Sequence, residues 1–181
     1  MPDEQRLQEA GESIVARIST AMSKVDWASF TDLARMLPKA RHIFVTGAGR
    51  SGLVARGFGM RLMHAGLSAY VPGETITPAT GEGDLLVAIS CTGTTGFTDY
   101  LASRAKRFGA DVAVITADSR SPLAGKADKV IVVPTIAEDI VLRAAVFEHA
   151  TGLCLDAVFD VLSETLKLDT ETYRNRHANL E

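Results

Sequence analysis

The chain has 181 residues, 46% of them hydrophobic and 23% charged, with a formal net charge of −3. This composition is typical of a globular protein with a sizeable core, and the slightly acidic balance argues against a general nucleic-acid-binding surface. The two cysteines, Cys91 and Cys154, form neither a disulfide framework nor a metal-binding spacing, which indicates a reducing compartment. The start of the chain lacks the apolar segment of a signal peptide, and no apolar run is long enough to span a bilayer. We therefore expect a cytoplasmic protein with neither nucleic acid nor a membrane as a partner.

Helical periodicity marks the beginning of the chain. Apolar side chains recur at helical spacing over residues 5–24, and a second, short helix is expected over residues 27–37, where Pro38 would end it. Apolar strands and helices then alternate. The expected strands cover residues 42–46, 68–71, 85–90, 111–116 and 129–133, with helices over residues 51–65 and 96–108.

Continuous apolar strands that alternate with helices are typical of a parallel sheet covered on both faces. The sequence therefore predicts an α/β fold, a three-layer α/β/α sandwich with a five-stranded parallel sheet of the flavodoxin or Rossmann-like type. The pattern becomes helical again from Asp139 to Leu168, and the polar tail after it is typical of a frayed end. We expect one domain, with N-terminal helices in residues 1–40, the sheet core in residues 41–134, and the C-terminal helix and tail in residues 139–181.

Two glycine-rich loops follow strands of the predicted sheet. They read TGAGRSG at residues 46–52 and SCTGTTG at residues 90–96. The carboxyl ends of parallel strands meet at one edge of a sheet, and the helix that each loop opens offers free N–H groups to an anion. We expect phosphate contacts from these loops, although any single hydroxyl could instead be a helix cap. The candidate residues are Gly49, Arg50, Ser51, Ser90, Thr92, Gly93 and Thr95.

The first loop also matches the dinucleotide pattern G-x-G-x-x-G, through Gly47, Gly49 and Gly52, and Glu74 lies where a ribose-binding acid would be expected. That pattern usually sits at the first strand near the start of a chain, whereas residues 1–40 precede it here. Little of the chain remains after the sheet to form a substrate domain. We therefore favour a site for a single phosphate over a nicotinamide cofactor.

Four stretches carry a family resemblance. They read GAGRSGLVARGFGMRLMHAG at residues 47–66, VPGETITPA at residues 71–79, GDLLVAIS at residues 83–90 and RHANLE at residues 176–181. Together they resemble the sugar isomerase (SIS) domain family, and within it the 6-phospho-3-hexuloisomerases. The resemblance implies a tetramer without metal or organic cofactor that interconverts D-arabino-hex-3-ulose 6-phosphate and D-fructose 6-phosphate. This is the second step of formaldehyde fixation in the ribulose monophosphate pathway, so a 3-hexulose-6-phosphate synthase is the expected pathway neighbour.

The chain departs from the usual family pattern at two places. The second loop usually reads like SGSGET, whereas here it is SCTGTT, so that Thr92 replaces a serine and Thr94 a glutamate. A Gly-Thr pair usually stands before Phe147-Glu148, where this chain has Ile140-Val141-Leu142-Arg143. We expect phosphate binding to survive the first change, and we expect the second to alter the local shape near Glu148.

The implied reaction needs a base that takes a proton from C2 and returns one to C3 through a cis-enediolate. Glu148 is the first candidate, because a carboxylate in the apolar stretch AAVFEHATGLCL is costly unless it is used or paired. The alternative is a glutamate at the edge of a buried face. His177 is the second candidate, since the resemblance implies that it reaches a site, often that of a neighbouring subunit. Without the resemblance, a lone histidine in a polar tail is usually only solvated.

The remaining polar candidates have more than one interpretation. Arg50 could pair with a phosphate or an enediolate oxygen, or form a surface salt bridge. Glu74 and Thr75 could contact substrate hydroxyls or a subunit interface. His64 and His149 fit packing or interface positions. Cys91 is not expected to be a nucleophile, because isomerisation needs none and its neighbours are not basic.

Two other functions stay open. The first is another phosphosugar isomerase, acting on a heptose or arabinose phosphate. The second is a sugar-phosphate-sensing module, as in transcription regulators that contain an SIS domain. Such regulators also carry a helix-turn-helix domain, for which the acidic segment before Ile43 is too short.

Overall fold

The computed structural model describes residues 2–136 and 140–180. Five strands form one parallel sheet in the order β2-β1-β3-β4-β5. They are β1 (Ile43–Gly47), β2 (Ala69–Tyr70), β3 (Leu85–Ile89), β4 (Asp111–Thr116) and β5 (Lys129–Val132). The predicted α/β class and the five parallel strands are confirmed. Because β2 lies on one side of β1 and β3 on the other, the direction of winding reverses between β1 and β3.

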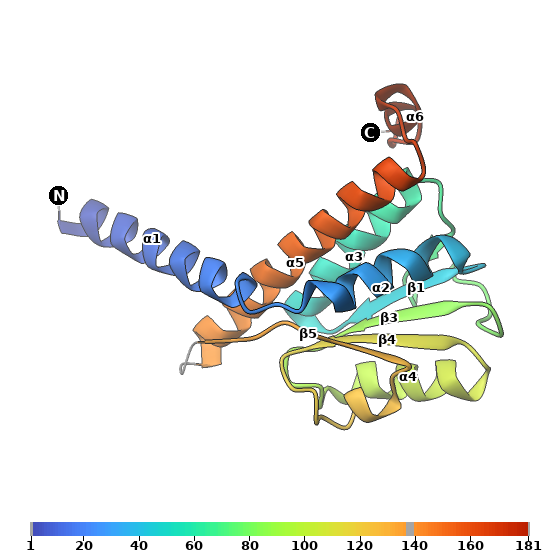
Figure 1. Cartoon of the computed structure of the whole chain (residues 1–181), viewed down its shortest axis with the longest axis horizontal. Helices are drawn as coiled ribbons and strands as arrows, with labels where there is room; N and C mark the ends of the chain where they lie inside the picture. Colours follow the sequence, from blue (N-terminus) through green and yellow to red (C-terminus); the bar gives the residue numbers. More distant parts are fainter. Residues whose placement is uncertain (1, 137–139, 181) are drawn as a thin grey trace.

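Helices cover both faces of the sheet (Figure 1). They are α1 (Pro2–Met22), α2 (Trp27–Met36), α3 (Gly49–His64), α4 (Gly96–Arg107), α5 (Ile140–Thr165) and α6 (Thr170–Asn175), with 3-10 turns at Leu37–Lys39 and Ala124–Lys126. On one face α2, α3 and α5 pack against strand residues such as Val45 and Val87. On the other face α4 packs against Phe44 and Leu86. Alternate residues of β1, β3 and β4 therefore enter two separate cores, as expected when both faces of a sheet are buried.

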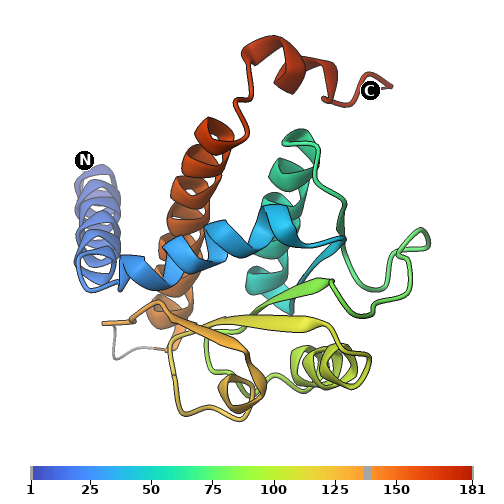
Figure 2. The same ribbon diagram turned by 45° about the vertical axis from the view of Figure 1, so that its right-hand side comes forward.

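Helix α1 leaves the body of the molecule (Figures 1 and 2). Its last turns pack on the core through Ile18, Ala21 and Met22. The apolar side chains of Leu7 and Val15, nearer its start, are exposed. The apolar face predicted from the periodicity of this helix is thus only partly covered by its own chain.

The prediction that the polar tail is a frayed end is wrong. Residues of the polar tail form α6 rather than a frayed end, because the Asp169 side chain caps that helix by accepting a hydrogen bond of 2.6 Å from the backbone N–H of Thr172. Helix α5 is observed from Ile140 to Thr165, whereas its expected first residue, Asp139, lies outside the described residues, as do the chain ends, Met1 and Glu181. Among residues 2–136 and 140–180, no helix combines the length and the apolar character needed to cross a membrane.

Candidate functional site

The two predicted loops meet where the sheet changes direction. Gly47, the last residue of β1, is paired with Ile89, the last residue of β3, so the loops that follow start side by side. Helices α3 and α4 begin from these loops, and neither Ala48 nor Thr95 caps its helix with a side chain. Crevices at such switch points are the usual ligand sites of open parallel sheets, and uncapped helix N-termini favour anions there.

Close backbone packing explains why two positions of the first loop are glycines. A Cβ atom on Gly47 would lie 2.8 Å from the backbone of Ser51, and a Cβ atom on Gly52 would lie 2.7 Å from the carbonyl oxygen of Gly47. The end of β1 and the first turn of α3 approach too closely for any side chain there. This contact accounts for two of the three glycines in the G-x-G-x-x-G pattern without a dinucleotide. The structure also starts α3 at Gly49, so that Arg50 and Ser51 lie in its first turn rather than in the loop.

Hydroxyl groups organise the second loop. Ser90 is only 3% exposed, and its Oγ atom accepts a hydrogen bond of 3.2 Å from the N–H of Gly93 and lies 3.1 Å from Oγ1 of Thr95. The hydroxyls of Thr92 and Thr94 are 2.8 Å apart at the exposed tip. Ser90 therefore shapes the loop from beneath, whereas Thr92 is open to a ligand.

The loop after β4 packs against the second loop and hydrogen-bonds to it, a contact that the sequence did not predict. Gly93 has a φ of +63°, and a Cβ atom there would lie 2.0 Å from Oγ of Ser121. The N–H of Leu123 donates to the carbonyl oxygen of Gly93 at 3.1 Å, and the Thr116 hydroxyl donates to the carbonyl oxygen of Cys91 at 3.2 Å. The polar stretch TADSRS directly after an apolar strand was the signal available in the sequence.

Two predicted site residues from distant parts of the chain form an ion pair. Nε of Arg50, in the first turn of α3, donates a hydrogen bond to Oε2 of Glu148 in α5. The Glu148 side chain is 17% exposed and the Arg50 side chain 49%. The carboxylate that looked costly on an apolar helix is thus paired, and it lies beside the first turn of α3.

A second arginine, Arg143 of α5, lies near the loops. The positive charge of Arg143 acts on the Cys91 thiol, which follows β3, although burial is the larger influence and raises the pKa of Cys91 above its ordinary value. The expectation that Cys91 has no basic neighbour was therefore wrong, because it considered only neighbours in the sequence. The thiol is still held in its protonated form, which does not suit a nucleophile. Arg143 is a further cation beside the predicted phosphate loops.

Glu74 and Thr75 lie on the segment after β2, and both are exposed. Glu74 lines a cavity of about 280 Å³ together with Thr46, Gly52 and Arg56, and Arg56 Nε lies 3.9 Å from its carboxylate. This cavity opens at the same sheet edge as the first loop. It does not include the second loop or Glu148.

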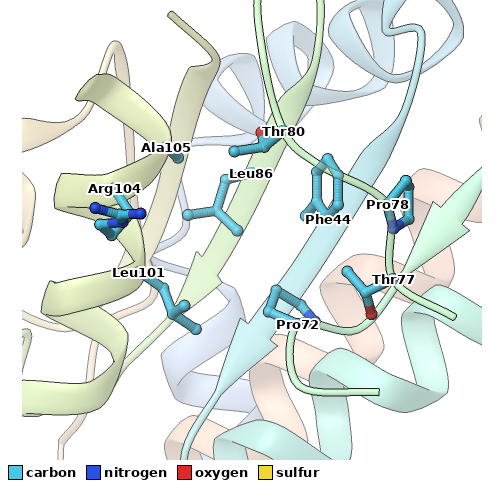
Figure 3. A pocket seen from close by; sticks show the side chains of 9 residues that line it. All are labelled: Phe44, Pro72, Thr77, Pro78, Thr80, Leu86, Leu101, Arg104 and Ala105. Atoms are coloured by element: carbon cyan, nitrogen blue, oxygen red, sulfur yellow. The ribbon is translucent and has the colours of Figure 1, made fainter. Parts of the chain in front are cut away.

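A smaller cavity lies behind the same segment, between it and α4 (Figure 3). Its volume is about 120 Å³, and Phe44, Leu86 and Leu101 supply much of its apolar lining. None of the predicted site residues lines it, so it is separate from the candidate site.

His177 is not brought to Glu148 within one chain. Its ring stacks on His64, the last residue of α3, with ring centroids 4.1 Å apart. Arg50, the partner of Glu148, lies in the first turn of the same helix, and the helical rise puts the two positions about 20 Å apart. His64 is buried, in line with its expected packing position, whereas His149 is exposed beside Glu148.

Comparison with known proteins identifies the family. Residues 36–158 match the SIS domain, which is more than half of the chain. The chain belongs to the SIS domain family. Relatives of this SIS protein include the 3-hexulose-6-phosphate isomerase of Mycobacterium gastri, 39% identical over 91% of this chain and 86% of the relative. The 3-hexulose-6-phosphate isomerase of Bacillus subtilis is also 39% identical, over 82% of this chain and 85% of the relative.

A solved structure supports the same assignment. The crystal structure of a hypothetical protein from Methanococcus jannaschii, for which a function as 3-hexulose-6-phosphate isomerase was inferred, superposes on this SIS domain with a TM-score of 0.85. The two are 30% identical, and the match covers 92% of this chain and 98% of the other. Within the described part of the SIS protein, no three His, Cys, Asp or Glu side chains are grouped as a metal site would require.

Proposed function

We propose that this SIS protein is a 3-hexulose-6-phosphate isomerase that interconverts D-arabino-hex-3-ulose 6-phosphate and D-fructose 6-phosphate. Relatives with that name, 39% identical over most of the chain, support the choice of substrate. The observation that carries the chemistry is the carboxylate of Glu148, largely buried and paired with Arg50 at the start of α3. A synthase that makes the hexulose phosphate would supply the substrate in the same cytoplasm.

The two loops are proposed to hold the phosphate. The free N–H groups at the starts of α3 and α4 and the Thr92 hydroxyl point to an anion, and Arg143 adds a nearby positive charge. The hydrogen bond from the N–H of Gly93 to Oγ of Ser90 keeps the second loop in shape. Helix N–H groups and hydroxyls can hold a phosphate without a lysine.

Glu148 is proposed as the base. It takes the proton from C2 of the hexulose phosphate and returns it to C3, while the proton on O2 moves to O3 and the carbonyl passes from C3 to C2. Because Arg50 donates its hydrogen bond to the Glu148 carboxylate, we propose that the guanidinium group moves this hydrogen bond to a substrate oxygen on binding. That exchange frees Glu148 and places a positive charge where the enediolate forms.

His177 is proposed to act in the site of a neighbouring subunit of a homotetramer. The surface around Glu148 supports an interface there, because Glu148 lines an open cavity of about 390 Å³ in which Ile18 and Leu153 lie beside the polar residues His149 and Asp156. Leu53, on the neighbouring helix α3, is 64% exposed. A second subunit that covered this face would bury apolar area and could bring a histidine to Glu148.

The test is a coupled assay. Ribulose 5-phosphate, formaldehyde and a hexulose-phosphate synthase supply the substrate, and fructose 6-phosphate is followed through glucose 6-phosphate to NADPH. We expect turnover by the wild type and a loss of about 10²–10⁴-fold in Glu148→Gln, the usual contribution of a general base. Glu164→Gln, which changes an exposed glutamate on the same helix, should behave as wild type. Binding of sugar phosphates without turnover would instead favour another phosphosugar isomerase or a sensor.

A further inference from the structure

Three aromatic rings gather at the end of the molecule opposite the candidate site. His64, at the end of α3, is 2% exposed, and its ring lies 25° from parallel to that of His177 in the stack. The ring centroid of Tyr173, in α6, is 5.0 Å from that of His64 and 4.9 Å from that of His177. His177 itself remains exposed, so the buried ring of His64 supports an accessible imidazole stacked on it.

The tail is also anchored through the backbone. Nη1 of Arg176 donates a hydrogen bond of 3.0 Å to the carbonyl oxygen of His64. This carbonyl belongs to the last turn of α3, where it has no partner further along the helix. The ring of Tyr173 also contacts that of Phe159 in α5, with centroids 6.2 Å apart. Figures 1 and 2 place α6 beyond the ends of both helices, so these contacts determine where the tail lies.

The surroundings of His64 favour ring stacking over a hydrogen bond at Nδ1. Its Nδ1 atom is buried and has no hydrogen-bond partner among the described residues. Burial lowers the pKa of His64, and the charges of His177 and Arg61 lower it further. A neutral buried ring can stack under His177 without a second charge beside it.

We propose that His64 is a positioning residue for His177, holding it at one place on the end of α3 for use in a neighbouring subunit's site. This inference rests on the proposed function, in which His177 works at Glu148 of another subunit. The structure supports it because the contact with His64 keeps His177 at the opposite end of α3 from the Glu148 of its own chain.

Two substitutions of His64 separate the ring from its nitrogen atoms. We expect His64→Ala to release the tail, so that amide hydrogen exchange of residues 170–177 speeds up by about tenfold or more. Its kcat should fall to that of His177→Ala, while KM stays within about twofold because the substitution leaves the loops after β1 and β3, the proposed phosphate contacts, unchanged. His64→Phe keeps a flat ring and loses no hydrogen bond at Nδ1, so it should restore both tail protection and kcat.

A second variant removes the aromatic ring on the tail side of the same contact. Tyr173→Ala removes a half-buried ring outside the two cores and should reproduce the effects of His64→Ala, whereas Arg174→Ala, at an exposed position of α6, should match wild type. The inference is overturned if tail protection persists in both ring variants, or if the tail is released with kcat unchanged. It also fails if His177→Ala keeps full activity. A wild-type chain without isomerase activity would overturn the proposed function itself, a result visible before any variant is made.

Discussion

Arg50 and Glu148 lie 98 positions apart in the sequence, and the side chain of Arg50 donates directly to the carboxylate of Glu148. One residue comes from the glycine-rich loop pattern and the other from an apolar helix near the end of the chain. The ion pair joins the first predicted phosphate loop to the candidate base. It also means that a substrate oxygen and Glu148 would compete for the same guanidinium group.

Replacing Arg50 should therefore weaken substrate binding more than folding. We expect Arg50→Met to raise KM by about 10-fold or more, because a charge-assisted hydrogen bond contributes roughly 1.5–3 kcal/mol. Its melting temperature should also fall, by an amount that corresponds to about 1 kcal/mol, because the Glu148 side chain is only 17% exposed and loses its partner. Steady-state kinetics and thermal unfolding measure both, with Arg107→Met on the exposed face of α4 as the control. An unchanged KM would remove Arg50 from the proposed site.

Gly93 should tolerate no side chain. Gly93→Ala places a methyl group 2.0 Å from Oγ of Ser121 at a φ of +63°, so the second loop must shift. We expect a loss of roughly 1–3 kcal/mol in the free energy of unfolding, together with weaker phosphate binding. Gly125→Ala is the matched control, because nothing lies within 4 Å of a Cβ atom there and its φ is not positive. Partial rescue of Gly93→Ala by Ser121→Gly would identify the clash as the cause, and wild-type stability in Gly93→Ala would contradict it.

Asp84 should make stability depend on pH in the acid range. Burial alone would raise the pKa of Asp84, but hydrogen bonds from Arg41 and the N–H of Gly81, with the charges of Arg41 and His42, hold it below its ordinary value. A depressed pKa means that the carboxylate stabilises the fold above the unfolded value of 3.8, and that this contribution is lost as the pH falls through the lower folded value.

Asp84→Asn tests this effect. We expect the variant to lose about 1–3 kcal/mol of stability at neutral pH, because a buried, hydrogen-bonded carboxylate is removed. The difference in melting temperature between wild type and variant should shrink below about pH 4. Comparing the two proteins at each pH removes the contributions of other carboxylates. A difference that stays constant through the acid range would show that the charge of Asp84 is not what stabilises the fold.

A site shared between subunits should allow complementation. Glu148→Gln and His177→Ala chains, each of low activity alone, should regain about a quarter of wild-type activity when they are unfolded together and refolded as a mixture, because random assembly of a symmetric oligomer joins one intact residue of each kind in that share of sites. The assay is the coupled one described above. Mixing the folded proteins without exchange of subunits is the control. If the refolded mixture shows only the average of the two variants, the histidine does not act across an interface.

Much of the fold could be predicted from local patterns. Each of the five strands lies within about two residues of its expected position, since short apolar runs between turn residues indicate buried strands directly. The two loops were recognisable because their glycines and hydroxyls follow those strands. The tail was wrongly expected to fray, because the cap from Asp169 and the contact of Tyr173 with His64 outweigh its polar composition.

The sequence by itself determined the parallel sheet, the two glycine-rich loops at its edge and the family, because each depends on residues that are neighbours along the chain. Only the tertiary structure decided that Arg50 pairs with Glu148, that Arg143 lies near Cys91, and that His177 rests on His64. These relationships depend on how α3 and α5 pack on the sheet and on the contact of the tail with the end of α3. Side chains far apart in sequence meet only through that packing, so local pattern carries no record of their partners.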